Sequence, residues 1–335
     1  MSIRNKLKRL LPSYRTENRM NAAMKALRED IREMDKKQEY LFLLSQMQPG
    51  ETIQEARERL YLKMPKATGR LRGIQLAENY ILQRVKQICD RNGLEMFLMG
   101  GTLLGALRHK GFIPWDNDVD IGMMAEDYRK LEALLADDPE LSLKYYYNYQ
   151  AGLKMSKVKF RTTEVFFIDI FVFDRVEATK ETADSVWKQT CVMNASFREK
   201  LAELAAPYVS QTGCRPSANE TLDAETAKLE TQMAQKLPVM GRGEYICETL
   251  DSPFWSREPR GIVPLEEYFP LRKDCVEFEG QFYSAWNHYE HALEHFFGDY
   301  WALPFSISEP HTTEFDEGLD EGLAFLREKG IISED

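Results

Sequence analysis

The chain has 335 residues, and 54 acidic against 44 basic side chains give it a formal net charge of −10. An acidic chain is poorly suited to following the polyanionic backbone of a nucleic acid, so we expect no nucleic-acid partner. Hydrophobic residues make up 43% of the sequence, which argues against large-scale disorder and allows a sizeable core.

The first predicted element, over residues 1–11, is basic and amphipathic. Ile3, Leu7, Leu10 and Leu11 recur at helical spacing between lysines and arginines. Two interpretations stay open: a helix that lies on an anionic membrane surface, or a basic terminus without a role. Because the chain has no apolar run of about 18 residues and no signal peptide, we expect a cytoplasmic protein with at most peripheral membrane contact.

Residues 21–47 predict a helix with a short heptad pattern. Apolar residues alternate at spacings of three and four, and Gln38 interrupts them; they are Met24, Leu27, Ile31, Met34 and Leu41. Such a stripe either packs on its own domain or pairs two chains as a homo-oligomer. Further helices are predicted over 53–62 and over 70–92, where Gly93 ends the second one.

A glycine pair separates a predicted strand from a predicted helix. The apolar residues 96–99 favour a short strand, and residues 102–108 favour a helix. Glycine lets the backbone approach a phosphate closely, and a helix N-terminus offers free amide hydrogens. We therefore expect Gly100, Gly101 and Thr102 to bind phosphate, with Arg108 and His109 adding positive charge where the following loop folds back.

Alternating aspartates follow the predicted helix. In an extended chain Asp116, Asp118 and Asp120 share one face, while Asn117 and Val119 share the other. Two carboxylates about 4 Å apart repel by roughly 1 kcal/mol in water and by more in a cleft. A hard divalent cation between them removes this cost. We expect magnesium, with manganese as the alternative.

A further acid is predicted on a later strand. Segments 143–149 and 155–161 alternate like paired strands, after a predicted helix over 126–135. Lys157 and Lys159 share one face of the second strand, which is either a solvated edge or a set of cations directed at a diphosphate. Asp169 comes next, among phenylalanines and isoleucines. A carboxylate is costly to bury alone there, and a shared metal would be its partner.

The remaining sequence offers less chemistry. Residues 182–237 predict an inserted helical hairpin, and residues 288–297 predict a helix after a region of short strands and turns. Trp115, Tyr300 and Trp301 either form an aromatic wall for a quaternary ammonium or serve in packing. Five cysteines without CxxC spacing are expected to be reduced core thiols.

Several segments together resemble the LicD family, relatives of the fukutin and fukutin-related proteins. They are GGTLLGALRHKGFIPWDNDVDIGM (100–123), FIDIFVFD (167–174) and FGDYWALP (297–304), the last followed by His311. The resemblance implies an α+β fold, with a nucleotidyltransferase-like mixed β-sheet flanked by helices. We expect an N-terminal helical extension over 1–68, a catalytic core over 69–178, a helical insertion over 179–240 and an acceptor-side lobe over 241–335.

The resemblance also implies an activity and a site. Phosphocholine or a similar phospho-alcohol would pass from a CDP-activated donor to a hydroxyl of a cell-surface or capsular glycan, which can be lipid-linked, and CMP would leave. Asp118, Asp120 and Asp169 would be catalytic and hold the metal. Asn117 stands where the family often has an acid, but the alternation turns it away from the site. The expected substrate-binding residues are Gly100, Gly101, Thr102, Arg108, His109, Trp115, Lys157, Lys159 and His311.

Three alternative functions stay open. A metal-dependent glycosyltransferase also uses an Asp-x-Asp pair, and it would consume a nucleotide sugar. An adenylyltransferase or guanylyltransferase of the same fold would release pyrophosphate. A non-catalytic scaffold of a glycan-assembly complex would depend on the heptad segment instead of the acids.

Overall fold

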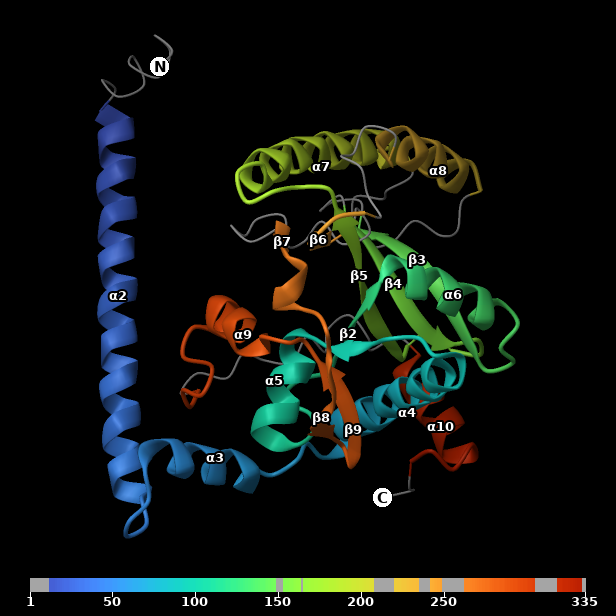
Figure 1. Cartoon of the computed structure of the whole chain (residues 1–335). Helices are drawn as coiled ribbons and strands as arrows, with labels where there is room; N and C mark the ends of the chain where they lie inside the picture. Colours follow the sequence, from blue (N-terminus) through green and yellow to red (C-terminus); the bar gives the residue numbers. More distant parts are fainter. Residues whose placement is uncertain are drawn as a thin grey trace. The chain divides into compact units, whose positions relative to one another are not determined.

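The computed structural model describes residues 12–148, 153–163, 165–207, 220–234, 242–248, 262–304 and 318–332. These residues form two compact units. The first contains α2 and α3, up to Lys63, and the segment that begins at Asp299; the second runs from Met64 to Gly298 and includes α10 (Figure 1). The basic segment 1–11 and His311 lie outside the described residues. No described helix is long and apolar enough to cross a membrane.

The first unit is built on two helices, α2 (Pro12–Gln46) and α3 (Ile53–Lys63). Glu39 is 4% exposed and joins them, because it accepts hydrogen bonds from Arg57 Nε at 2.8 Å and from the backbone N–H of Leu303 at 2.9 Å. Tyr61 on α3 donates to the carbonyl of Ala302. Polar contacts thus attach the later segment to the end of α2 and to α3.

The second unit begins with α4 (Gly69–Asn92), β1 (Phe97–Leu98), α5 (Gly100–His109), β2 (Asp120–Met124), α6 (Ala125–Ala136), β3 (Leu141–Asn148), β4 (Leu153–Phe160) and β5 (Phe167–Val176). It continues with α7 (Ala183–Ala205), α8 (Glu220–Ala234), β6 (Tyr245–Glu248), β7 (Ile262–Pro264), β8 (Arg272–Phe278), β9 (Gln281–Ala285), α9 (Tyr289–Phe297) and α10 (Leu319–Glu328). Helix α4 ends where predicted, because Gly93 adopts a left-handed φ of +65° as its C-cap.

Seven of the described strands form one mixed sheet. The order is β1-β2-β5-β4-β3; β2 and β5 are parallel, and β6 pairs with β5 beyond the end of β4. Tyr128 of α6 hydrogen-bonds to Ser156 Oγ at 3.1 Å, so α6 covers the sheet face that carries Ser156. The predicted α+β class with a mixed sheet flanked by helices is confirmed.

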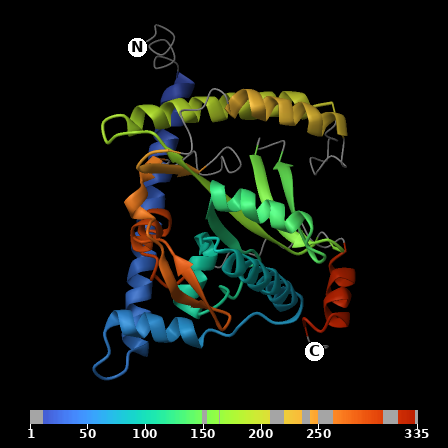
Figure 2. The same ribbon diagram turned by 45° about the vertical axis from the view of Figure 1, so that its right-hand side comes forward.

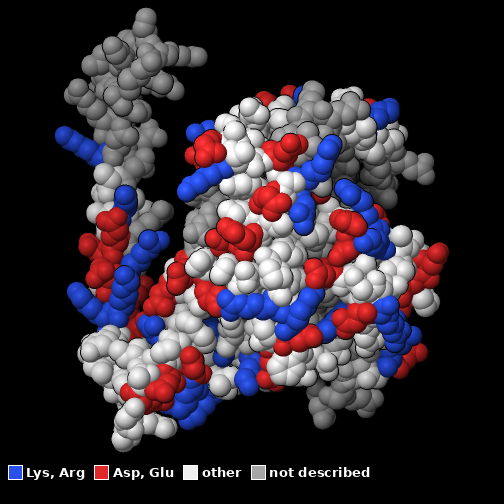
Figure 3. Space-filling model, viewed as in Figure 1, with Lys and Arg blue, Asp and Glu red and all other residues white. Residues whose placement is uncertain are grey.

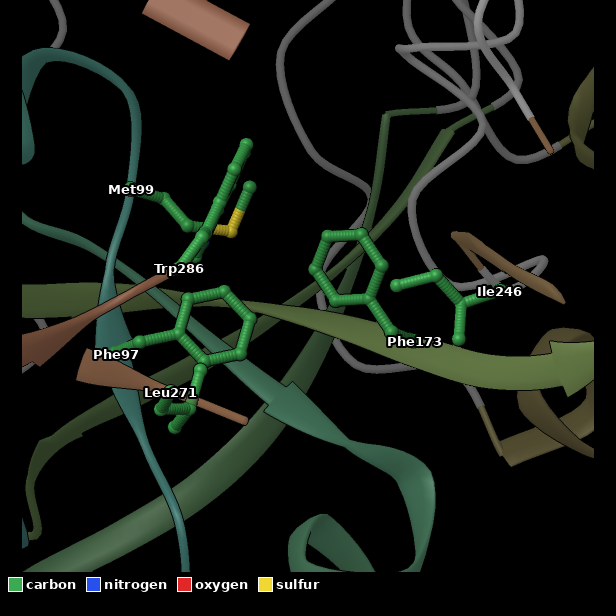
Figure 4. Close-up of a cluster of buried hydrophobic side chains, with 6 residues drawn as sticks. All are labelled: Phe97, Met99, Phe173, Ile246, Leu271 and Trp286. Atoms are coloured by element: carbon green, nitrogen blue, oxygen red, sulfur yellow. The ribbon is translucent and has the colours of Figure 1, made fainter. Parts of the chain in front are cut away.

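An apolar cluster joins the sheet to the β8–β9 hairpin. Its buried members, shown in Figure 4, are Phe97, Met99, Phe173, Ile246, Leu271 and Trp286. Phe97 meets Trp286 edge to face, with ring centroids 5.8 Å apart. Gly122 of β2 leaves room for this packing, because a Cβ there would overlap the Phe97 ring. The cluster therefore anchors β1, which leads directly into the glycine pair.

Helices α7 and α8 pack on each other through a separate small core of Phe197, Leu201, Ala205 and Leu222. They lie beside each other in both views (Figures 1 and 2), as the predicted helical hairpin requires.

Among the described cysteines, Cys89 and Cys247 are buried and none forms a disulfide. Cys275 is exposed, so the prediction of a core thiol is wrong there, because its side chain points outward from the β8–β9 hairpin.

Candidate active site

The glycine pair forms the first turn of α5 instead of preceding the helix. Gly100 has a left-handed φ of +48°. A Cβ at Gly100 would lie 2.8 Å from Asp120 Oδ2, and one at Gly101 would lie 2.8 Å from Asp116 Oδ2. The backbone N–H of Asp120 also donates to Thr102 Oγ1 at 2.8 Å. The glycines therefore let two carboxylates come close to the N-terminus of α5.

Asp116 and Asp118 lie in irregular chain before β2, and Asp120 is the first residue of the strand. Exposure alternates along this loop, since the three aspartates are half-buried while Asn117 and Val119 are buried. Asn117 therefore points away from the acids. From α4, Gln75 Nε2 donates to the backbone carbonyl of Asp116 at 2.8 Å and fixes the start of the loop.

Strand pairing brings Asp169 to the same place. On parallel strands Asp120 is in register with Asp169, and on the other side of β5 Asp169 is in register with Lys157 of β4. Side chains in register on neighbouring strands share a face of the sheet. Lys157 Nζ lies 2.8 Å from Asp169 Oδ1 and 3.0 Å from Oδ2. The structure thus shows a lysine as a charge partner of Asp169, and the shared metal expected from the sequence stays a prediction.

Burial and neighbouring charges raise the pKa of Asp116, Asp120 and Asp169. Burial, the charge of Asp118 and a hydrogen bond with it raise the pKa of Asp116 to about 8. Burial, followed by the charges of Asp118, Asp169 and Asp116, raises the pKa of Asp120 well above its ordinary value. Burial also raises the pKa of Asp169, although Lys157 opposes the rise. Acids from the loop, β2 and β5 therefore form one electrostatic unit.

Helix α4 contributes an acid that sequence reasoning missed. Glu78 is 1% exposed, and its Oε2 has no hydrogen-bond partner. Burial and the charges of Asp118, Asp116 and Asp169 raise the pKa of Glu78 well above its ordinary value. The sequence did contain a signal for Glu78, because it lies on the apolar stripe of α4, one turn after Ile74. An acidic residue at a core position indicates a functional role or a buried partner.

The donor set suits a hard divalent cation in kind. Carboxylate oxygens are the ligands that magnesium and manganese prefer, and the orphaned Glu78 oxygen adds to them. As the described side chains lie, however, no three His, Cys, Asp or Glu groups converge closely enough to enclose an ion. The residues therefore fit such a cation by ligand type and charge, although as they lie they do not enclose one.

Other predicted residues lie farther from the glycine pair. Arg108 and His109 are in the last turn of α5, so their backbone lies about 12 Å from Gly100 at 1.5 Å per residue. The glycines begin the helix that Arg108 and His109 end, and the expectation that these two residues add positive charge at the same phosphate stays a prediction. The His109 ring meets Trp115 edge to face at 6.5 Å. Lys159 is 1% exposed, so the solvated-edge interpretation is wrong for it.

The predicted aromatic wall is not assembled within one unit. Trp115 is half-buried in the second unit. Trp301 belongs to the first unit, where its ring centroid lies 6.2 Å from that of Tyr61 and 6.0 Å from that of Tyr300. Within the first unit these rings pack against one another.

Comparison with known proteins places this site in a family. Residues 93–205 match the family model described as "LicD/FKTN/FKRP, nucleotidyltransferase domain". Over 251 residues, 70% of the chain, the sequence is 29% identical to the lipopolysaccharide cholinephosphotransferase LicD of Haemophilus influenzae, and it covers 92% of that protein.

Shorter matches reach two animal transferases. The chain is 39% identical over 64 residues, 19% of its length, to the human ribitol 5-phosphate transferase FKRP, of which it covers 12%. It is 30% identical over 108 residues, 32% of its length, to the ribitol-5-phosphate transferase FKTN of Macaca fascicularis, of which it covers 22%. Residues 93–205 therefore form a domain of the LicD family.

Proposed function

We propose that this protein transfers a phospho-alcohol from a CDP-activated donor to a hydroxyl of a cell-surface or capsular glycan and releases CMP. The observation that carries the proposal is the meeting of Asp120 and Asp169, on adjacent parallel strands, beside the glycine N-terminus of α5. The named transferases among the relatives support phosphoryl transfer. The relative covered along 92% of its length is named for choline, so phosphocholine is the first group to test.

The reaction needs one bond to form and one to break. The acceptor oxygen attacks the phosphorus that carries the alcohol, the bond from this phosphorus to the bridging oxygen of CMP breaks, and the electron pair leaves with CMP. The acceptor hydroxyl loses its proton, and Asp169 is the carboxylate to take it.

Residues around Asp169 fit the charges of this reaction. The backbone amides of Gly100, Gly101 and Thr102, in the first turn of α5, would donate to phosphate oxygens, helped by the dipole of the helix. Lys157 provides a fixed positive charge beside Asp169. Asp118 and Asp120, with Asp169, would hold magnesium or manganese. When bound, this cation would neutralise charge on the donor's diphosphate.

A donor panel tests the proposal. The purified protein is incubated with magnesium and CDP-choline, CDP-ethanolamine, CDP-glycerol or CDP-ribitol, together with a glycan acceptor, and CMP is followed by chromatography. We expect CMP from one of these donors. Consumption of a UDP-sugar instead would support the glycosyltransferase alternative, and pyrophosphate from a nucleoside triphosphate would support the nucleotidyltransferase one. No turnover of any donor would favour the scaffold.

Asp118 provides the sharpest mutational test of the site. We expect Asp118→Asn to lower CMP release at least about a hundredfold, a loss of about 3 kcal/mol in transition-state stabilisation. The matched control is Asp137→Asn, which removes an exposed carboxylate in the turn after α6 and should leave turnover unchanged. Full activity of Asp118→Asn would contradict the assignment.

A further inference from the structure

Glu78 is an unexplained charge in the interior of the second unit. Its carboxylate is 1% exposed, and Oε2 has neither a hydrogen-bond donor nor solvent beside it. A buried carboxylate without a partner costs several kcal/mol, so such groups are normally paired or bound to a metal. The described residues show Lys157 as the cation that acts on Glu78, and this lysine is already paired with Asp169.

The position of Glu78 on α4 directs it toward the aspartate loop. Gln75 lies three residues earlier on the same helix face and already contacts the loop, through its bond to the carbonyl of Asp116. The charges that act most strongly on Glu78 after burial are those of Asp118 and Asp116. The contact made by Gln75 and these charges thus place Glu78 beside the aspartate loop, and Asp169 also acts on it.

We propose that Glu78 is a further ligand of the divalent cation held by the aspartates, contributed by α4 and absent from the set recognised in the sequence. The inference rests on the proposed function, because it needs the cation there. It explains why a glutamate occupies a core position of α4. A cation would satisfy the orphaned oxygen and remove the repulsion between Glu78 and the aspartates in one step.

Manganese binding without any substrate tests this proposal. The probe is Mn²⁺ alone, and the free ion is followed by electron paramagnetic resonance in wild-type protein, Glu78→Gln and Asp90→Asn. Asp90 is the control because it lies on the same helix with an exposed side chain. We expect the Mn²⁺ dissociation constant to rise at least tenfold in Glu78→Gln and to stay unchanged in Asp90→Asn.

Thermal unfolding gives a second readout. Without metal, Glu78→Gln should unfold at a temperature equal to or above that of the wild type, because a buried carboxyl group without a partner is replaced by a neutral amide. The rise in unfolding temperature on adding Mn²⁺ should be smaller than in the wild type. Should Glu78→Gln fail to fold, Glu78→Asp keeps the charge, withdraws the carboxylate by one methylene group and should weaken Mn²⁺ binding several-fold. Wild-type affinity in the folded variants would overturn the Glu78 proposal alone, whereas a wild type that binds no Mn²⁺ would overturn the metal site itself.

A second inference comes independently from α2. Six apolar residues of α2 follow the a and d positions of a heptad repeat, and all six are exposed: Met20 61%, Met24 46%, Leu27 53%, Ile31 47%, Met34 69% and Leu41 67%. Taking Met24 as a and Leu27 as d places Asp30 and Lys37 at g and Asp35 at e. A stripe of this regularity is typical of a helix that packs against another helix.

The charges beside the stripe select an orientation. In a parallel pair, g contacts the e position five residues later in the second copy, so Asp30 would meet Asp35 and repel it. In an antiparallel pair with Ile31 opposite Met34, g faces g, and Asp30 meets Lys37 twice by symmetry. From this pattern we infer that α2 pairs with α2 of a second copy of this chain in antiparallel orientation.

Charge exchange tests both the pairing and its orientation. Sedimentation equilibrium of the full chain should show a dimer, and Lys37→Glu should raise its dissociation constant several-fold, because acids then face each other. Lys36→Glu makes the same charge change on the opposite helix face and should have no effect. Combining Asp30→Lys with Lys37→Glu should restore the wild-type constant.

Three results would overturn the second inference. A monomeric wild type would exclude the pairing. Tighter association of Asp30→Lys would indicate the parallel orientation, in which the new lysine meets Asp35. Unchanged association after Ile31→Lys, at the central layer of the stripe, would show that dimers form through another surface.

Discussion

Gly100 shows how a single residue can shape the site. Its left-handed backbone and the nearby Asp120 carboxylate both disfavour a side chain. We expect Gly100→Ala to cost about 1–2 kcal/mol of stability through the strained φ and to lower CMP release tenfold or more by displacing Asp120. Gly93→Ala is the control, since its φ is +65° and an added methyl group meets nothing within 4 Å. Equal losses of activity in the two variants would mean that strain alone is responsible.

Glu279 contributes to the stability of the folded protein, and the size of this contribution depends on pH. It is 6% exposed, lies at the turn of the β8–β9 hairpin, and accepts hydrogen bonds from Arg72 at 2.7 and 3.2 Å and from Lys66 at 2.9 Å. Burial alone would raise the pKa of Glu279, but these two cations outweigh it and lower the pKa below 4.5. Stability from this group is therefore present above pH 4.5 and lost as the pH falls through the lower, folded-state pKa.

We expect Glu279→Gln to lower the free energy of unfolding by about 2–3 kcal/mol at pH 7, as for other hydrogen bonds between charged groups. The difference from wild type should disappear at a pH below the folded-state pKa. Urea unfolding of both proteins at a series of pH values from 7 downward measures it. A difference of the same size at every pH would show that shape, not charge, makes the contribution.

At the scale of elements, the α7–α8 hairpin has a core of its own. Leu201 is fully buried among Phe197, Ala205 and Leu222, apart from the cluster that anchors β1. We expect Leu201→Ala to cost about 2–4 kcal/mol locally, with faster amide hydrogen exchange in α7 and α8. Exchange in α4 and β5 should be unchanged, and an equal acceleration there would mean that the hairpin and the sheet unfold together.

The β8–β9 hairpin braces the glycine helix. The backbone N–H of Glu279 donates to the carbonyl of Lys110 at 2.9 Å, and the Glu279 carboxylate lies over Gly111, where a Cβ would overlap it. Lys110 also pairs with Glu277 at 3.1 Å. These contacts hold the end of α5, while Thr102 holds its beginning to β2. An element far along the sequence thus helps to position the glycine turn at the start of α5.

At the scale of the whole molecule, the surface charge limits which partners the protein can bind. Lysines and arginines are intermixed with acids over the described part of the face in Figure 3, and the net charge is −10. We expect no retention on immobilised single-stranded DNA at about 150 mM salt. The described face has no continuous track of basic residues that could bind the DNA phosphates, and salt screens the weak attraction that remains. Chromatography with lysozyme as a positive control measures this. Binding that weakens steeply with salt would contradict the expectation.

The sequence by itself determined those structural features that depend on residues only a few positions apart in the chain. Residue spacing was enough for the end of α4 at Gly93, for the helical hairpin at α7 and α8, and for the alternation that turns Asn117 away from the acids. The motif around the glycines and aspartates was likewise sufficient to name the family. Such features follow from local backbone geometry and from side-chain periodicity.

Only the tertiary structure decided which distant groups meet. The register of β4, β5 and β2 places Lys157, Asp169 and Asp120 side by side, and it made a lysine the partner of Asp169. Packing of α4 added Glu78, and the start of α5 at Gly100 moved Arg108 a helix length away. Register and helix packing are set by burial summed over the whole core, which no short stretch of sequence contains.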